Sequence, residues 1–505
     1  MNIQIILFVA LLACPFLALV TNFLPWRKKP VLTAHIASSF IGIGALLGVV
    51  LLTCLPFSKA PTVYLLIGFN TLGLLLCTLI LLVSFVVHRF SIRYMDGDRL
   101  YCRYFLTLAA ITCSAVIMVL ADNLLLFWFA WSLSNVLLIT LMVHKNQWAA
   151  AKNSGWLALS TLLPGSLSMI IAFVLINITT HTTSIQVLVQ QSSLISTPVL
   201  FVALSLIICT AATQSALWPF HRWLISSLNS PTPVSALMHA GLVNGGGILI
   251  VKFAPLFAMH KGLLTVLFIF GAISALLGTI WKLMQSDIKR MLACSTLAQM
   301  GFMMMQCGVG LFAAAIAHLC WHGLFKAYLF LSSGSAVKQK KSVVNSSKAS
   351  PGLLLASLTG GAVAMTAFAF ATNKPVSLFE ANAFVLFFAF IAGAQLMFTW
   401  VRSHQTPLSL ISALVLAFFT GLMYGGSIHL VEFLIPSIST IQAPQLSSVH
   451  WVAMILFGSL WVIFNLGVHQ TMGQSKLGYW LYMNLFNSSQ PSRKTMTALR
   501  NDYNY

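Results

Sequence analysis

Runs of about twenty apolar residues recur along almost the whole chain, and they constrain its fold more than any other feature. A helix that crosses the hydrocarbon core of a membrane needs about 20 such residues. The runs do not alternate apolar and polar residues, as the strands of an outer-membrane barrel do. We therefore predict an all-α polytopic membrane protein with about 13–15 transmembrane helices. Fifteen runs qualify, near residues 3–24, 31–55, 62–87, 103–120, 123–143, 155–178, 198–217, 233–256, 262–281, 290–308, 310–333, 352–373, 381–401, 406–427 and 450–470.

The composition supports this fold class, since 59% of the residues are hydrophobic and only 7% are charged. Such values exclude an ordinary soluble enzyme. The run at 3–24 is too long, and lacks the basic lead, for a cleaved signal peptide, so we expect it to be the first span. We assign residues 1–471 to a transmembrane domain with a core of about 103–401. Residues 472–505 are too polar for the membrane and form a predicted cytoplasmic tail, which is either a docking surface or disordered.

The net charge of +20 follows the loops rather than forming one patch. Lys and Arg on one side of the predicted spans greatly outnumber those on the other side, which holds only Lys59, Lys261 and Lys374. By the positive-inside rule we expect the N-terminus outside and the C-terminus in the cytoplasm. The basic charge is thus an orientation signal, and we expect the lipid bilayer, not a nucleic acid, as its partner.

Enzymatic signatures are missing from the sequence. The nine cysteines are scattered without a CxxC motif or a regular spacing to His, so they are expected to behave as small hydrophobes. We find no Gly-rich phosphate loop after a strand and no candidate nucleophile triad. The sequence therefore predicts no catalytic residue, no metal, no cofactor and no disulfide framework in this chain.

The few acidic residues avoid the middle of the predicted spans. All seven fall in loops, turns, helix ends or the tail, namely Asp96, Asp98, Asp122, Asp287, Glu380, Glu432 and Asp502. This distribution argues against proton transport on intramembrane carboxylates. Basic side chains remain as the candidates for an ion pathway.

The strongest candidates are His318, His322 and Lys326, which lie four residues apart in one predicted span. This spacing places all three on one face of a helix. A Lys in the hydrocarbon is costly unless it is paired or meets water, so such residues usually line a polar cavity. The three therefore suggest a chain of proton-accepting sites. The alternative is that the two His bond neighbouring helices and that Lys326 snorkels from a helix end.

His239 and Lys252 form a second group of candidates, in the predicted run 233–256. His239 sits deep in the run 233–256 beside small residues, which also suit close helix packing. Lys252 lies nearer the outer end, where snorkelling is an equal alternative.

Three prolines precede His239 in the stretch WPFHRWLISSLNSPTPVSALMHAG. They are Pro219, Pro231 and Pro233. Proline frees a helix carbonyl, and a broken helix at membrane depth is tolerated where protein or water satisfies the backbone. Such breaks often mark an ion or substrate path, although an ordinary cytoplasmic turn is the simpler alternative.

That stretch resembles the proton-translocating membrane subunits of respiratory complex I and the large subunit of Mrp-type cation/proton antiporters. The similarity extends in order to SIRYMDGD (91–98), LADNLLLFWFAW (120–131), DIKRMLACSTLAQMGF (287–302) and HLCWHGLFKAYLFLSSGS (318–335). It implies two inverted five-helix repeats, each with a discontinuous helix. It also implies that His239, His318, His322 and Lys326 occupy positions on the family's polar axis.

Two family charges are replaced. The central Glu of the pumping members corresponds to Ser132 here, and its partner Lys corresponds to Gln214. The chain also ends soon after its last span. In these features, in WSLSN (131–135) and in its basic tail, it resembles the membrane subunits of DAB-type inorganic carbon uptake complexes.

This second resemblance implies a location in a bacterial inner (cytoplasmic) membrane. It also implies a partner, a large cytoplasmic zinc subunit (DabA-like) that resembles a β-carbonic anhydrase. The membrane subunit would conduct a coupling cation, H⁺ or Na⁺, to drive CO2 hydration to bicarbonate in that partner, without catalysis of its own. Two alternatives stay open at this point. The chain is an ion-pumping subunit of a redox complex or antiporter, or it is a non-conducting scaffold that anchors a soluble enzyme.

Overall fold

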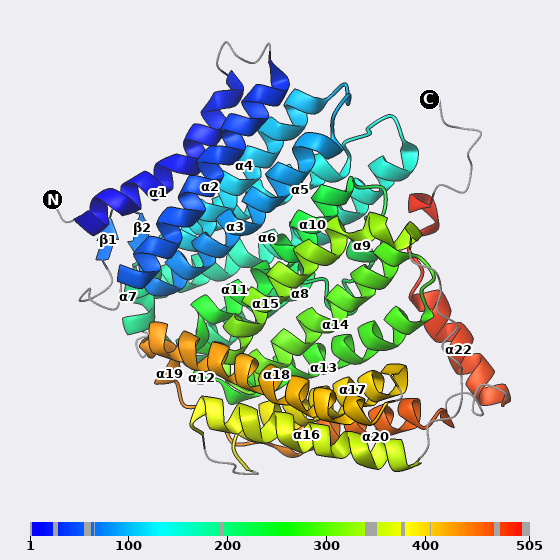
Figure 1. Ribbon diagram of the computed structural model, residues 1–505. Coiled ribbons are helices and arrows are strands. Elements are labelled where there is room, and N and C mark those ends of the chain that lie inside the picture. Colours follow the sequence, from blue (N-terminus) through cyan, green and yellow to red (C-terminus); the bar gives the residue numbers. More distant parts are fainter. Residues whose placement is uncertain are drawn as a thin grey trace.

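The computed structural model describes residues 3–23, 29–54, 62–64, 66–191, 195–338, 351–374, 379–404, 406–468 and 475–496. Its long helices pack side by side in one bundle. The N-terminal helices lie on one side, the middle of the chain forms the centre, and α16 to α20 lie on the other side (Figure 1).

Within the described ranges, fourteen helical segments are long and apolar enough to cross a membrane, which confirms the predicted all-α polytopic fold. They are α1 (Ile3–Val20, extended by η1, Thr21–Phe23), α2 (Pro30–Cys54), α3 (Thr71–Tyr94), α4 (Tyr101–Leu120), α5 (Leu124–Met142), α6 (Ala149–Thr180), α8 (Thr197–Gln214), α10 with α11 (Thr232–Ala240 and Gly245–Lys252), α13 (Lys261–Met284), α15 (Phe312–Leu331), α16 (Pro351–Thr372), α17 (Asn382–His404), α18 (Pro407–Leu434) and α20 (Ser448–Asn465). A further helix, α14 (Ile288–Gly308), matches the predicted run 290–308 but is less apolar than these fourteen.

Short elements lie between the spans, within one of them or in the tail. They are α7 (Ile185–Gln190), α9 (Arg222–Ile225), η5 (Leu242–Asn244), α12 (Ala254–Ala258), η6 (Ser333–Lys338), α19 (Pro436–Ser439), α22 (Lys476–Ser488) and η7 (Arg493–Thr495).

The start of the third predicted span, 62–87, was wrong. Residues 62–69 form an antiparallel hairpin of β1 (Thr62–Tyr64) and β2 (Ile67–Phe69), and α3 begins only at Thr71. The cause is local: the Asn70 side chain accepts a hydrogen bond from the Gly73 amide at 2.7 Å and so caps α3. The hairpin is also tied to the next turn, since the Asp122 amide donates to the Leu66 carbonyl at 2.9 Å.

The stretch that contains the prolines separates α8 from α10. α8 ends at Gln214, before Pro219, and α10 begins at Thr232 with Pro231 as its N-cap residue and Pro233 in its first turn. Polar side chains satisfy the interrupted backbone. The Trp218 amide donates to Ser274 Oγ at 3.0 Å, and the Trp223 indole donates to the Thr213 carbonyl at 3.0 Å.

A second interruption was missed, because the run 233–256 looks like one span. The structure divides it at Gly241–Asn244 into α10, η5 and α11. The carbonyls that this break frees are used by residues of the first break: Gln214 Nε2 donates to Leu242 O at 3.1 Å, and Ser215 Oγ donates to Val243 O at 2.8 Å. The two broken segments therefore support each other at the centre of the bundle.

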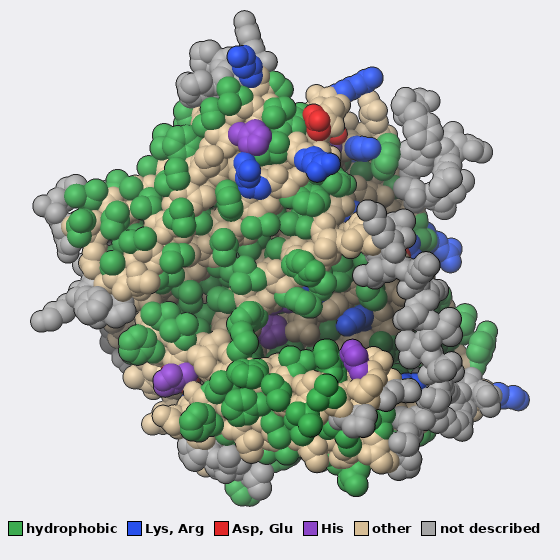
Figure 2. Space-filling model, in the orientation of Figure 1, with side chains coloured by type: hydrophobic (Ala, Val, Ile, Leu, Met, Phe, Trp, Pro, Cys, Tyr) green, Lys and Arg blue, Asp and Glu red, His purple; other side chains and the backbone are tan. Residues whose placement is uncertain are grey.

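The predicted tail is ordered over residues 475–496, whereas 472–474 and 497–505 lie outside the described residues. α22 and η7 lie across helix ends at the right of Figure 1. The Ser492 amide donates to Ser226 Oγ at 3.1 Å, and Asn229 Nδ2 donates to Thr495 O at 2.8 Å, so the tail is docked on the loop that precedes α10. In Figure 2, Lys and Arg side chains gather along the upper and right-hand parts of the view, and hydrophobic side chains cover most of the remainder. The tail contacts the starts of α6 and α14, the loop before α10 and the end of α13. We call these helix ends the basic face.

Candidate ion pathway

Four of the five predicted pathway residues come together at the contact between α10 and α15. His239, His318, His322 and Lys326 are 1%, 7%, 4% and 1% exposed. Lys326 therefore does not snorkel to a surface. Its Nζ donates to the carbonyl oxygen of Leu292, on α14, at 3.1 Å. An ammonium held in this way still has two N–H groups available for other acceptors.

His239 is joined to Lys326 through α14. Its Nδ1 lies 3.1 Å from Thr296 Oγ1, and that hydroxyl donates to Leu292 O at 3.0 Å. The same carbonyl accepts from Lys326, so one backbone oxygen connects the two titratable side chains. The His239 ring also stacks on Phe330 at 4.3 Å between centroids, which fixes its plane.

His322 is oriented by Asn244, in the second break. Asn244 Nδ2 donates to Ala240 O at 2.7 Å, so its Oδ1 is left to accept from His322 Nδ1 at 3.1 Å. Nε2 of His322 then carries a lone pair. This nitrogen and Nε2 of His318 are both buried and have no partner among the described residues. The two rings lie 6.0 Å apart and nearly parallel. Buried polar groups are normally paired with protein or water, so these nitrogens suit a proton relayed by water.

A glycine allows this close approach. A Cβ on Gly323, one residue after His322, would lie 2.9 Å from the Ala240 carbonyl oxygen. Because Gly323 has no Cβ, α15 packs closely against the end of α10. The titratable side chains of α15 then meet His239 and Asn244.

Lys252, the fifth predicted residue, lies apart from this cluster at the end of α11. Its Nζ donates to Ala121 O at 2.7 Å and sits 5.1 Å above the Phe127 ring. Asp122, beside it, accepts from Ser184 Oγ and from the Gln186 amide. Lys252 and Asp122 both line a cavity of about 460 Å³ between the start of α3, α7 and α19.

The two neutral replacements do not contact each other as a pair. Ser132 Oγ is hydrogen-bonded to Ser166 Oγ at 2.6 Å, on α6. Gln214 instead exchanges two hydrogen bonds with Asn135, each 3.0 Å long. Both side-chain amides of the Asn135–Gln214 pair are thus hydrogen-bonded, and Gln214 also ties the pair to Leu242 in the second break, which suits a structural role.

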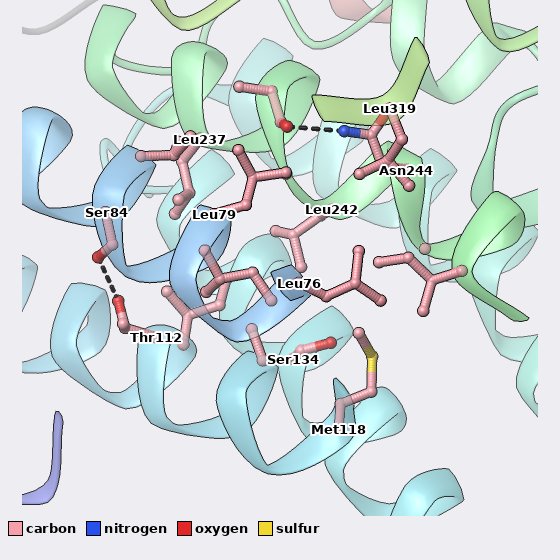
Figure 3. A pocket seen from close by; sticks show the side chains of 18 of the residues that line it. Leu76, Leu79, Ser84, Thr112, Met118, Ser134, Leu237, Leu242, Asn244 and Leu319 are labelled. Atoms are coloured by element: carbon pink, nitrogen blue, oxygen red, sulfur yellow. Dashed lines mark hydrogen bonds between the residues drawn. The ribbon is translucent and has the colours of Figure 1, made fainter. Parts of the chain in front are cut away.

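A small apolar cavity lies beside this amide pair. It has a volume of about 40 Å³, and Leu76, Leu79, Leu237, Leu242 and Leu319 are among its walls (Figure 3). The polar groups at its edge are already paired: Ser84 with Thr112 at 2.6 Å, and Asn244 with Ala240 O. The walls are otherwise mostly apolar, so the cavity offers a water few hydrogen-bond partners.

We expect the amide pair to behave as one structural unit. Replacing Gln214 by Leu strands the buried Asn135 amide and is expected to cost about 1–3 kcal/mol of stability. The Asn135→Leu/Gln214→Leu double variant removes both amides and should be more stable than either single variant. The midpoint of thermal unfolding of the detergent-solubilised chain measures this, and simply additive losses would contradict it.

Sequence reasoning missed Asn135, Asn244 and Thr296. Each is a polar residue inside a predicted apolar run, and Asn244 stands directly before the Gly triplet at 245–247. That isolation was the available signal. Their partners lie 57 to 79 residues away in the chain, so spacing alone does not reveal them.

Comparisons with known proteins agree with this architecture. Residues 121–406 match the family described as NADH:quinone oxidoreductase/Mrp antiporter, TM, and residues 62–105 match complex I chain 5 N-terminus. A subunit of the Mrp complex from Dietzia sp. has the same fold, with a TM-score of 0.66 and 21% identity over 98% of this chain and 58% of that one.

Curated relatives lie in two groups. A protein of Bacillus anthracis called probable inorganic carbon transporter subunit DabB is 36% identical over 74% of this chain and 72% of its own length. DabB1 of Halothiobacillus neapolitanus is 39% identical over 51% of this chain, and NADH-quinone oxidoreductase subunit L of Escherichia coli is 35% identical over 54%. These matches span about half of the latter two relatives, 47% and 46%. The chain therefore belongs to the NADH:quinone oxidoreductase/Mrp antiporter transmembrane family, and within it to the group that contains the DabB proteins.

Proposed function

We propose that this chain is the membrane subunit of an energy-coupled inorganic carbon uptake complex. It would conduct a cation, most simply H⁺, toward a cytoplasmic zinc partner that resembles a carbonic anhydrase and hydrates CO2 to bicarbonate. One observation carries the proposal: the His and Lys groups of α10 and α15 are buried together with unpaired imidazole nitrogens, whereas the Glu/Lys positions of the other half are the neutral Ser132 and Gln214.

The energetics fit such coupling. Hydration of CO2 is reversible, so accumulation of bicarbonate needs an energy input. One elementary charge that crosses the membrane potential supplies about 2.3 kcal/mol per 100 mV. The basic face, with its docked tail, is the proposed contact surface for the partner, where this energy would be delivered. Zinc and catalysis belong to the partner in this proposal.

The similarity to complex I subunits and the Mrp fold favours a second candidate, a proton-translocating subunit of a redox complex or a cation/proton antiporter. The neutral Ser132 and Gln214 weigh against it. Neighbouring genes separate the two: a large zinc-site protein supports the first candidate, and a full set of redox subunits supports the second.

Uptake of radiolabelled inorganic carbon tests the proposal. The chain is expressed in cells without carbonic anhydrase, alone and with its neighbouring large subunit. Uptake is expected only when both chains are present. If neither combination takes up carbon, but this chain alone restores Na⁺ or pH tolerance, the antiporter candidate holds and the carbon proposal is wrong.

A further inference from the structure

A second charged site lies at the opposite ends of the helices from the basic face. Lys374 follows α16 and Glu432 stands in the last turn of α18, and Lys374 Nζ is hydrogen-bonded to Glu432 Oε1. Their side chains are 31% and 17% exposed, so the pair marks a boundary between solvent and the bundle. Neither Lys374 nor Glu432 is among the pathway residues predicted from the sequence.

The ion pair borders a cavity of about 160 Å³. Thr372 and Asn382 add polar groups to its wall, and Phe312 to Ala314 close it from the first turn of α15. This volume is several times the space that one water requires, and charged and polar walls hold water. The cavity beside Gln214 is smaller, about 40 Å³, and its walls are mostly apolar.

The cavity stands at the head of the row of titratable residues on α15. Ala314 lines it, and His318, His322 and Lys326 follow at successive steps of four residues. Residues at this spacing share one helix face, about one turn apart. The wall of the cavity and the imidazole of His318 are thus neighbours along the same face.

Two other helices carry polar groups inward from the cavity. On α18, Glu432 and Ile428 line it, and Tyr424 follows one turn deeper. Tyr424 OH accepts from Gln306 Nε2 of α14 at 2.8 Å, and Gln306 Oε1 is buried without a partner among the described residues. One turn from Gln306, the Phe302 ring contacts the His318 imidazole at 5.4 Å.

We propose that this cavity is the water-filled mouth through which protons reach His318 from the side opposite the basic face, with Lys374 and Glu432 as its charged rim. Gln306 Oε1 and His318 Nε2 lie deeper than the cavity wall, and in this proposal further waters beyond the cavity supply their partners. A proton taken from solvent passes along these waters to the lone pair of His318, while Lys374 and Glu432 keep their charges. The inference deepens the proposed function and rests on it only for the use made of the protons.

Cysteine accessibility tests the mouth without any measurement of carbon uptake. Ala314→Cys is compared with Ala317→Cys, an equally buried position on α15 that does not line the cavity. Intact cells are treated with a membrane-impermeant cationic methanethiosulfonate, and labelling is measured above that of the unchanged chain with its native cysteines. Ala314→Cys is expected to react about tenfold faster than Ala317→Cys, because accessible thiols react and buried ones do not.

Equal rates at the two positions, or labelling of Ala314→Cys only in inverted vesicles, would overturn the inference and identify the cavity as a packing gap. If Ala314→Cys does not reach the membrane, Asn382→Cys replaces it, because Asn382 lines the same cavity from the start of α17. If Ala314→Cys is labelled as expected but the unchanged chain with its partner takes up no carbon, the proposed function is wrong and the inference about the cavity stands.

Discussion

The Lys326→Ala variant is expected to lose inorganic carbon uptake by about tenfold or more while the chain stays in the membrane. Lys326 is the only amine in the buried cluster, and its Nζ is linked through Leu292 O and Thr296 to His239. A charged residue inside a membrane protein is retained at a cost, so its removal affects function more than folding. His322→Ala should act similarly, because it deletes the imidazole between His318 and Lys326.

Lys261→Ala is the matched control, since Lys261 is an exposed lysine at the start of α13, away from both the buried cluster and the basic face. Its uptake should equal that of the unchanged chain. Membrane abundance and co-purification of the large partner are measured for each variant. Normal uptake in Lys326→Ala and His322→Ala would show that the chain is a scaffold rather than a conduit.

The Gly246→Val variant is expected to fail through packing rather than chemistry. A Cβ at Gly246 would lie 2.3 Å from Ser215 Oγ and 2.5 Å from the Ala211 carbonyl oxygen. The backbone of α8 would have to move away from α11, which separates the two broken segments. Overpacking of this kind costs about 1–3 kcal/mol or more. We expect a lower midpoint of thermal unfolding in detergent, and uptake lost with it.

Gly262→Val is the control for this change, because a Cβ at Gly262 meets no heavy atom within 4 Å. It introduces the same side chain near the start of α13. An unfolding midpoint for Gly246→Val equal to that of Gly262→Val would contradict the described contact between α8 and α11.

The helices and the pathway row follow from local patterns, which explains why sequence reasoning reached them. A span is a property of twenty neighbouring residues, and His318, His322 and Lys326 share a face by spacing alone. The prolines at 231 and 233 likewise mark the start of α10 directly.

The remaining features depend on contacts between distant segments. The break at Gly241–Asn244 holds because Gln214 and Ser215 use its carbonyls. The hairpin at 62–69 reads as apolar helix until its contact with Asp122 is known. Lys252, grouped with His239 because both lie in one run, is carried away from the cluster by that break.

Energy coupling is tested most directly by labelled carbon accumulation in cells that contain both chains, before and after a protonophore or a sodium ionophore dissipates one gradient. The account predicts that accumulation above equilibrium collapses with the coupling gradient, and that Lys326→Ala cells show no accumulation in either condition. Accumulation that persists after both gradients are dissipated would contradict ion conduction as the source of its energy.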